Sequence, residues 1–189
     1  VGTFKFERSE MLSANFRFGE HTVDADTLDF RLYAADSDSI ALATLNYRTH
    51  LDFNERTMEF LANEVGSMLE IPYNGYICSM EKIEWDMDGD ELVLTNNIEA
   101  MEGIEEMSPR ELIDVDLSGS DFISVNPVHD SLEFFSGNAR YNMKENIVYA
   151  EDVFKVNVAD AVIFPAARTL KILPGGTIET LENAGIIAN

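Results

Sequence analysis

Apolar and polar residues alternate with a period of two along most of the chain. Four early stretches show the pattern: Phe4 and Phe6; Phe16 and Phe18; Leu28, Phe30 and Leu32; and Leu45, Tyr47, Thr49, Leu51 and Phe53. Successive side chains of a strand point to opposite faces, so this spacing predicts strands with one buried face. The polar residues 54–57 and the alternating stretch 58–62 then predict a hairpin. The pattern as a whole is typical of an all-β fold.

The alternation changes phase between residues 76 and 87. One set of apolar residues has even numbers and the next has odd numbers: Tyr76, Cys78 and Met80, then Ile83, Trp85 and Met87. A bulge or a single helical turn near Glu81 would reconcile the two sets.

One short helix is expected near residues 108–113. Ser108 is a good N-cap residue, Pro109 suits the first helical position, and Glu111 completes a capping box. Alternation returns soon afterwards, so the helix is predicted to be part of a connector.

The connector divides the chain into two predicted parts. Residues 1–107 form an antiparallel β module, 108–118 the connector, and 119–189 a β-repeat module that resembles a solenoid. The repeat is suggested by Asn/Asp-Ala steps at 138–139, 160–161 and 183–184. We therefore predict stacked β-jellyroll or β-solenoid-like strands, with an antiparallel β-sandwich as the alternative. The two modules could also form one continuous stack of strands.

The composition restricts the partners of this chain. Thirty-five acidic residues against 13 basic ones give a formal charge of −22, which repels the phosphates of nucleic acids. The chain has no apolar run of about 18 residues, so we expect no membrane span and, equally, no signal peptide. Its single cysteine, Cys78, lies among apolar residues and is expected in the core. Both ends of the sequence suggest a piece of a longer polypeptide.

The stretch "WDMDGDELVL" is the nearest approach to a chemical motif. Asp86, Asp88 and Asp90 occupy alternate positions, as in a calcium loop, but Glu91 stands where such a loop needs glycine. An Asp-Gly step between alternating apolar runs favours a hairpin turn in which Gly89 takes a positive φ. We therefore expect a turn and no cofactor, with these aspartates as weak candidates for calcium.

Other site chemistry is sparse in the sequence. The histidines His21, His50 and His129 are far apart, and there is no nucleophile elbow, phosphate loop or dinucleotide fingerprint. We expect no enzyme activity. Trp85 is the candidate for a carbohydrate-binding platform, although a single tryptophan in an alternating strand is more often part of the core.

The last third of the chain resembles the β-jellyroll repeats of the organic-solvent-tolerance, or lipopolysaccharide-transport, family. The resemblance covers residues 131–189 and is carried by Ala139, Tyr141, Asn142, Asn146, Ile147, Ala150, Glu151 and Val153, with Asp152 in place of the usual glycine. It implies stacked strands in the cell envelope, whose open edges join neighbouring modules and whose interior holds acyl chains. The chain is also similar to modules of large exported β-repeat proteins.

Two functional hypotheses follow. The first is a non-catalytic scaffold module of a large envelope or exported protein, periplasmic or extracellular, that joins neighbouring modules of the same chain through edge strands. Contact with lipid or acyl chains is its sharper version. The alternative is a carbohydrate-binding or carbohydrate-active domain, assisted by calcium and using Trp85.

Overall fold

The computed structural model describes residues 1–34, 37–63, 66–96, 103–117 and 121–188, and the regular secondary structure in these ranges is mostly β-strand. The strands are β1 (Gly2–Phe6), β2 (Ser9–Ser13), β3 (Phe16–Phe18), β4 (Thr22–Tyr33), β5 (Ile40–Asp52), β6 (Thr57–Ala62), β7 (Met68–Ile71), β8 (Tyr76–Cys78), β9 (Lys82–Asp86), β10 (Glu91–Thr95), β11 (Asp121–Ser124), β12 (Glu133–Phe135), β13 (Asn138–Asn142), β14 (Ile147–Glu151), β15 (Val156–Val158), β16 (Ala161–Phe164), β17 (Leu170–Ile172) and β18 (Gly185–Ala188). The helical segments are η1 (Ile104–Glu106), α1 (Pro109–Ile113) and η2 (Pro127–His129). The all-β class and the short helix are thus confirmed.

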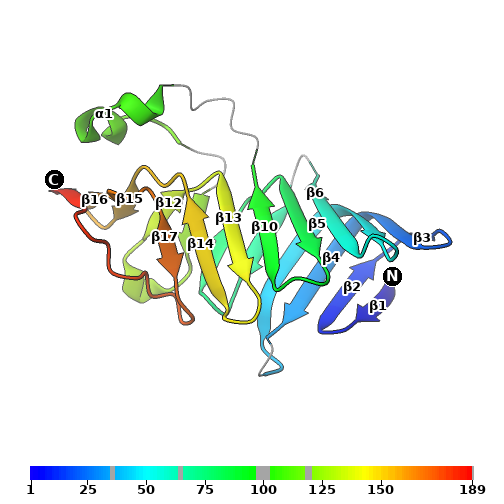
Figure 1. The fold of residues 1–189 in the computed structure, drawn as a ribbon. Coiled ribbons are helices and arrows are strands. Elements are labelled where there is room, and N and C mark those ends of the chain that lie inside the picture. Colours follow the sequence, from blue (N-terminus) through cyan, green and yellow to red (C-terminus); the bar gives the residue numbers. More distant parts are fainter. Residues whose placement is uncertain (35–36, 64–65, 97–102, 118–120, 189) are drawn as a thin grey trace.

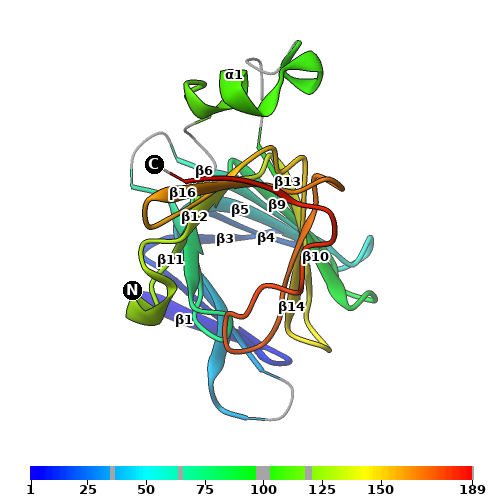
Figure 2. The same cartoon turned by 90° about the vertical axis from the view of Figure 1, so that its left-hand side faces the viewer.

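All the strand pairs are antiparallel and belong to one continuous sheet, which is folded into two layers (Figures 1 and 2). β4 and β5 run through both layers. One end of β5 pairs with β6 and the other with β7. Layer 1 continues from β6 through β9, β10, β13 and β14 to β17, and layer 2 continues from β7 through β8, β11, β12, β15 and β16 to β18. The chain builds this jellyroll-like sandwich by adding pairs of strands to each layer in turn.

The sheet divides at a bulge in β5. Asn46 takes a left-handed conformation with φ of 62°, which an asparagine tolerates better than most residues. Asn63 Nδ2 and Ser67 Oγ both donate to the carbonyl oxygen of Asn46, at 3.1 and 2.7 Å, and hold the bulge in place. Because one residue is inserted there, Leu45 points outward while Tyr47 points into the core. The prediction that these two side chains share a face is therefore wrong.

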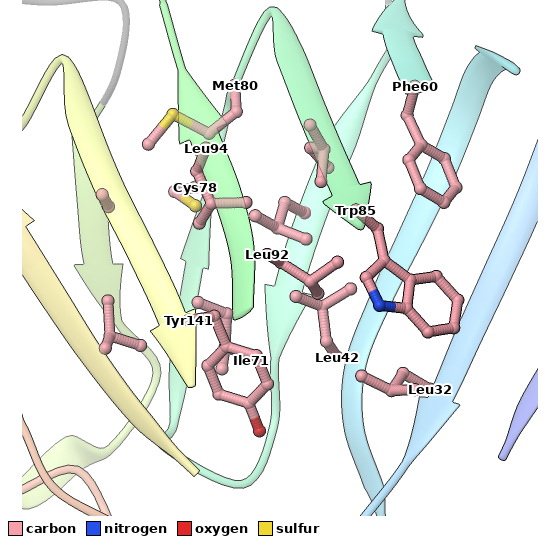
Figure 3. Close-up of a cluster of buried hydrophobic side chains, with 14 of the residues drawn as sticks. Leu32, Leu42, Phe60, Ile71, Cys78, Met80, Trp85, Leu92, Leu94 and Tyr141 are labelled. Carbon is pink, nitrogen blue, oxygen red and sulfur yellow. The ribbon is translucent and has the colours of Figure 1, made fainter. Parts of the chain in front are cut away.

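The core lies between the two layers. Figure 3 shows Trp85 among its side chains, with Phe60, Leu32 and Leu42 nearby. Phe30 connects this group, since its ring meets that of Phe60 edge-on at 4.9 Å and lies 6.3 Å from that of Trp85. Burying a side chain of this size stabilises the fold by about 1.5–3 kcal/mol.

Burial keeps the ionisable side chains of the core in their neutral form. Tyr47 donates its hydroxyl to the carbonyl oxygen of Met80 at 2.7 Å, and burial raises the pKa of Tyr47. Burial also raises the pKa of Tyr76 to about 12 and raises the pKa of the Cys78 thiol. Cys78 is a buried, un-ionised core residue, as the sequence predicts.

Asn74, in the turn between β7 and β8, joins the two layers at one end of the strands. Its buried side-chain Nδ2 donates to the carbonyl oxygens of Asn146 at 2.9 Å, Ile172 at 3.2 Å and Leu173 at 3.0 Å. Gly176 packs against this turn so closely that an added Cβ would lie 2.6 Å from the Asn74 carbonyl oxygen. We call Asn74, Asn146, Ile172, Leu173 and Gly176 together the turn junction.

The helical segment 103–117 covers part of the outer face of layer 2, above β15 and β16 (Figure 1). Ile104 and Leu112 pack there against Phe154 and Phe164 in a second apolar cluster. Lys155 holds the segment by donating its ammonium to the backbone carbonyl oxygens of Ile113, the last residue of α1, and Val115, at 3.0 and 2.7 Å. The predicted capping box is present. The Glu111 carboxylate accepts from the Ser108 hydroxyl at 2.7 Å and its backbone N–H at 2.8 Å, and these hydrogen bonds lower the pKa of Glu111.

The predicted connector does not separate two sheets. β8 and β10 precede it, yet β8 pairs with β11 and β10 pairs with β13, both of which follow it. The strands therefore form the continuous stack considered as an alternative. The Asn/Asp-Ala steps occupy unlike places: 138–139 lies in β13, 160–161 spans the end of a turn and the first residue of β16, and 183–184 lies before β18.

Candidate functional site: the edges of the sheet

The sheet ends in layer 2 at β18. Gly185–Ala188 pairs with β16 on one side, and within the described ranges no strand pairs with its other side. Strand edges carry backbone N–H and C=O groups that can bind a further strand, and charged residues commonly protect them. β18 has no charged residue, and Ile186 is 67% exposed. β18 is thus an apolar edge suited to pairing.

The corresponding edge of layer 1 is closed by the chain itself. Residues 173–184, which we call the C-terminal strap, turn back along β17 and then cross to layer 2 (red in Figure 2). Leu173 donates its N–H to Thr177 at 2.8 Å, and Glu179 donates its N–H to Lys171 at 2.9 Å. Ile178 and Leu181 pack against the core and cover its end. At the C-terminal end, layer 2 therefore offers the more open edge.

The opposite end of the sheet carries charge on its edge strands. β1 pairs with β2, and β3 pairs with β4. Lys5 on β1 forms an ion pair with Glu10 at 3.2 Å, and Arg17 on β3 forms one with Asp26 at 2.6 Å. The two ends of the stack therefore differ, with charged edges at one end and the apolar β18 at the other.

The aspartates of "WDMDGDELVL" form a hairpin turn between β9 and β10. Asp86 Oδ1 accepts the backbone N–H of Asp88 at 3.0 Å, and the Asp88 carboxylate binds Arg56 Nε at 2.6 Å. The turn does not use Gly89 as predicted, because its φ is not positive. Instead, the Asp86 carbonyl accepts the Gly89 N–H at 2.9 Å, a contact that any residue except proline can make.

The same turn chemistry occurs in the other hairpins of layer 1. Asp52 Oδ1 accepts the backbone N–H groups of residues 54 and 55 at 2.8 and 3.0 Å, and Asn142 Oδ1 accepts those of residues 144 and 145 at 3.0 and 2.8 Å. These side chains replace the backbone partners that a tight turn lacks. Asp86 therefore has a structural role in its turn.

Calcium is expected to leave the melting temperature unchanged. In the described part of the chain, no group of three or more His, Cys, Asp or Glu side chains could hold a metal ion. A ligand that binds only the folded state must raise the melting temperature. Thermal unfolding in millimolar calcium and in chelator measures the difference, with magnesium as the control. A rise specific to calcium would contradict this expectation.

The remaining sequence candidates do not meet in one site. Trp85 is 4% exposed and lies in the core, so its ring offers no surface platform for a sugar. His50 binds Asp24 at 2.7 Å, His129 binds Ser124 at 2.8 Å, and His21 lies near Glu20. Each histidine thus has a local partner of its own.

Comparisons of the chain with protein-family models, with curated proteins and with solved structures give no match. The fold and its edges define an all-β, two-layered protein. No helix among the residues described is long and apolar enough to cross a membrane.

Proposed function

We propose that the chain is a non-catalytic β module that joins neighbouring β modules through its open strand edges, as part of a large envelope or exported protein. The observation that carries the proposal is β18, an uncharged strand that ends layer 2 with Ile186 exposed. An incoming strand would gain backbone hydrogen bonds along β18 and an apolar contact with Ile186. The envelope location rests on the resemblance of residues 131–189 to the lipopolysaccharide-transport repeats.

A more specific form of this proposal is that the module contacts acyl chains. Core side chains occupy the space between the layers, from Met11 near β1 to Ile172 near the strap. An acyl chain would have to displace them to enter. We therefore propose that any lipid contact is made at the open end beside Ile186, where apolar surface is already exposed.

Self-association of the chain tests the edge. A second copy is the simplest β module available, and added salt screens the repulsion between two chains of charge −22. We expect sedimentation velocity to show association that grows with protein and salt concentration. Ile186→Lys should abolish it, because a lysine on an edge strand opposes pairing.

The matched control is Val93→Lys, which places the same charge at an exposed position of β10, a strand paired on both sides. This variant should associate as the unmodified chain does. A chain that stays monomeric at every concentration and salt, or an Ile186→Lys variant that associates normally, would refute the proposed role of β18.

A further inference from the structure

The outer faces of the two layers differ in chemistry. On layer 1, charged side chains bind one another within and between strands: Lys82 lies 2.8 Å from both Glu84 on its own strand and Glu59 on β6, and Arg140 lies 3.1 Å from Glu151 on β14. These contacts make layer 1 a solvated, ion-paired surface. The described residues at the centre of layer 2 include exposed apolar side chains instead.

These side chains form what we call the apolar strip, which consists of Leu45, Met68, Ile77, Ile123 and Val125. Leu45 is 44%, Ile123 41% and Val125 55% exposed. The strip is continuous across strands, because Leu45 pairs with Met68 and Ile77 pairs with Ile123. Met68, Ile77 and Ile123 also line a hollow of about 160 Å³. Contiguous exposed apolar surface of this kind marks interaction sites.

The strip lies beside surface that the chain already covers with a helical segment. Further along the same outer face, Val162 and Ile187 pair across β16 and β18 and pack in the cluster beneath Ile104 and Leu112. The outer face of layer 2 therefore accepts an amphipathic segment, and its apolar surface continues beyond the part that this segment covers.

The acidic side chains around the apolar strip favour a partner with basic residues. Glu70 is paired with Ile77 at one side of the strip, Glu133 is paired with Ile123 at the other, and Asp121 lines the hollow. A second copy of the chain would bring carboxylates against these carboxylates. A segment with an apolar face and basic flanks would meet both the strip and its rim.

We propose that the apolar strip binds a basic amphipathic helix of a partner protein. The apolar face of the helix packs on Leu45, Ile77 and Ile123, and its lysine or arginine side chains lie against Glu70 and Glu133. This surface is distinct from the β18 edge, so the two proposals can fail separately.

A labelled synthetic helix tests the proposal. The probe is a peptide of leucine and lysine, about 14 residues long, with leucines three and four positions apart, and its control is a peptide of scrambled order. We expect fluorescence anisotropy to show binding of the patterned peptide. Leu45→Ser with Ile123→Ser should weaken that binding about tenfold or more, as truncating central anchors does.

Val93→Ser is the matched control, because it removes an exposed apolar side chain from the outer face of layer 1. It should leave the affinity unchanged, and the emission of the buried Trp85 reports that every variant is folded. The proposal would be overturned if the scrambled peptide bound as tightly as the patterned one, because the binding would then be charge attraction alone. It would also be overturned if the variant carrying both strip substitutions bound the patterned peptide as tightly as the unmodified chain does. Binding to phosphatidylcholine vesicles but not to the peptide would also overturn it.

Discussion

Asn74→Asp is expected to lower the free energy of unfolding by about 3–5 kcal/mol. The substitution keeps the shape of the side chain but replaces the Nδ2 donor by an oxygen. That oxygen would face the carbonyl oxygens of Asn146, Ile172 and Leu173, to which Nδ2 now donates. The three carbonyl oxygens would lose this donor, and a buried carboxylate would gain no compensating partner. Because the turn junction connects both layers, the substitution should destabilise the whole sheet.

Urea unfolding followed by Trp85 fluorescence measures this loss. Asn54→Asp makes the same chemical change at an exposed turn position and should alter the free energy of unfolding by less than about 0.5 kcal/mol. A loss of less than about 1 kcal/mol for Asn74→Asp would show that the turn junction does not hold the layers together.

Phe60→Ala is expected to lower the free energy of unfolding by about 3–5 kcal/mol, the usual cost of truncating a buried aromatic side chain. Phe60 is fully buried in β6, and its ring lies against Phe30 in the group that includes Trp85 (Figure 3). The cavity should also bring water closer to the indole. Urea unfolding and the emission maximum of Trp85, expected to shift to longer wavelength, measure the two effects.

Phe18→Ala provides the comparison, because Phe18 lies on the edge strand β3 and is largely exposed. It should alter the free energy of unfolding by less than about 1 kcal/mol and leave the Trp85 emission unchanged. If the two variants lose the same stability, the core does not lie where Figure 3 places it.

Local patterns in the sequence predicted the local structure well. The alternation of Leu28, Phe30 and Leu32 placed all three in the core, and the stretch around residues 54–57 does turn the chain between β5 and β6. The helix starting at Pro109 was also predictable, because its cap is made by neighbours in sequence. These features depend on interactions within a few residues.

The exchange of strands between layers could not be read from the same patterns. The change of phase near Glu81 is a passage from β8 in layer 2 to β9 in layer 1, where a bulge or helical turn was expected. A bulge does occur, but at Asn46, where a left-handed asparagine reverses the side that Leu45 faces. Period-two alternation shows that a strand has a buried face, but it does not show which layer the strand joins.

The candidate surfaces depend on pairing partners far away in sequence. Ile186 is exposed because β18 ends a layer, and nothing within Gly185–Ala188 distinguishes it from an internal apolar strand. Ile77 and Ile123 become neighbours only because β8 pairs with β11. Both surfaces follow from the topology, which the sequence alone left open.

The strand order gives the stack a direction. Ten antiparallel pairs connect β1 to β18 through layer 2, and ten reversals leave these two strands pointing the same way. Identical copies placed one after another along the stack would therefore meet as parallel strands, against the pattern of every described pair, whereas two copies related by a two-fold axis would pair their β18 strands antiparallel. A neighbour that continues the antiparallel pattern at β18 must present a strand of the opposite polarity, so the geometry discriminates between partners even where the edge has no charge to do so.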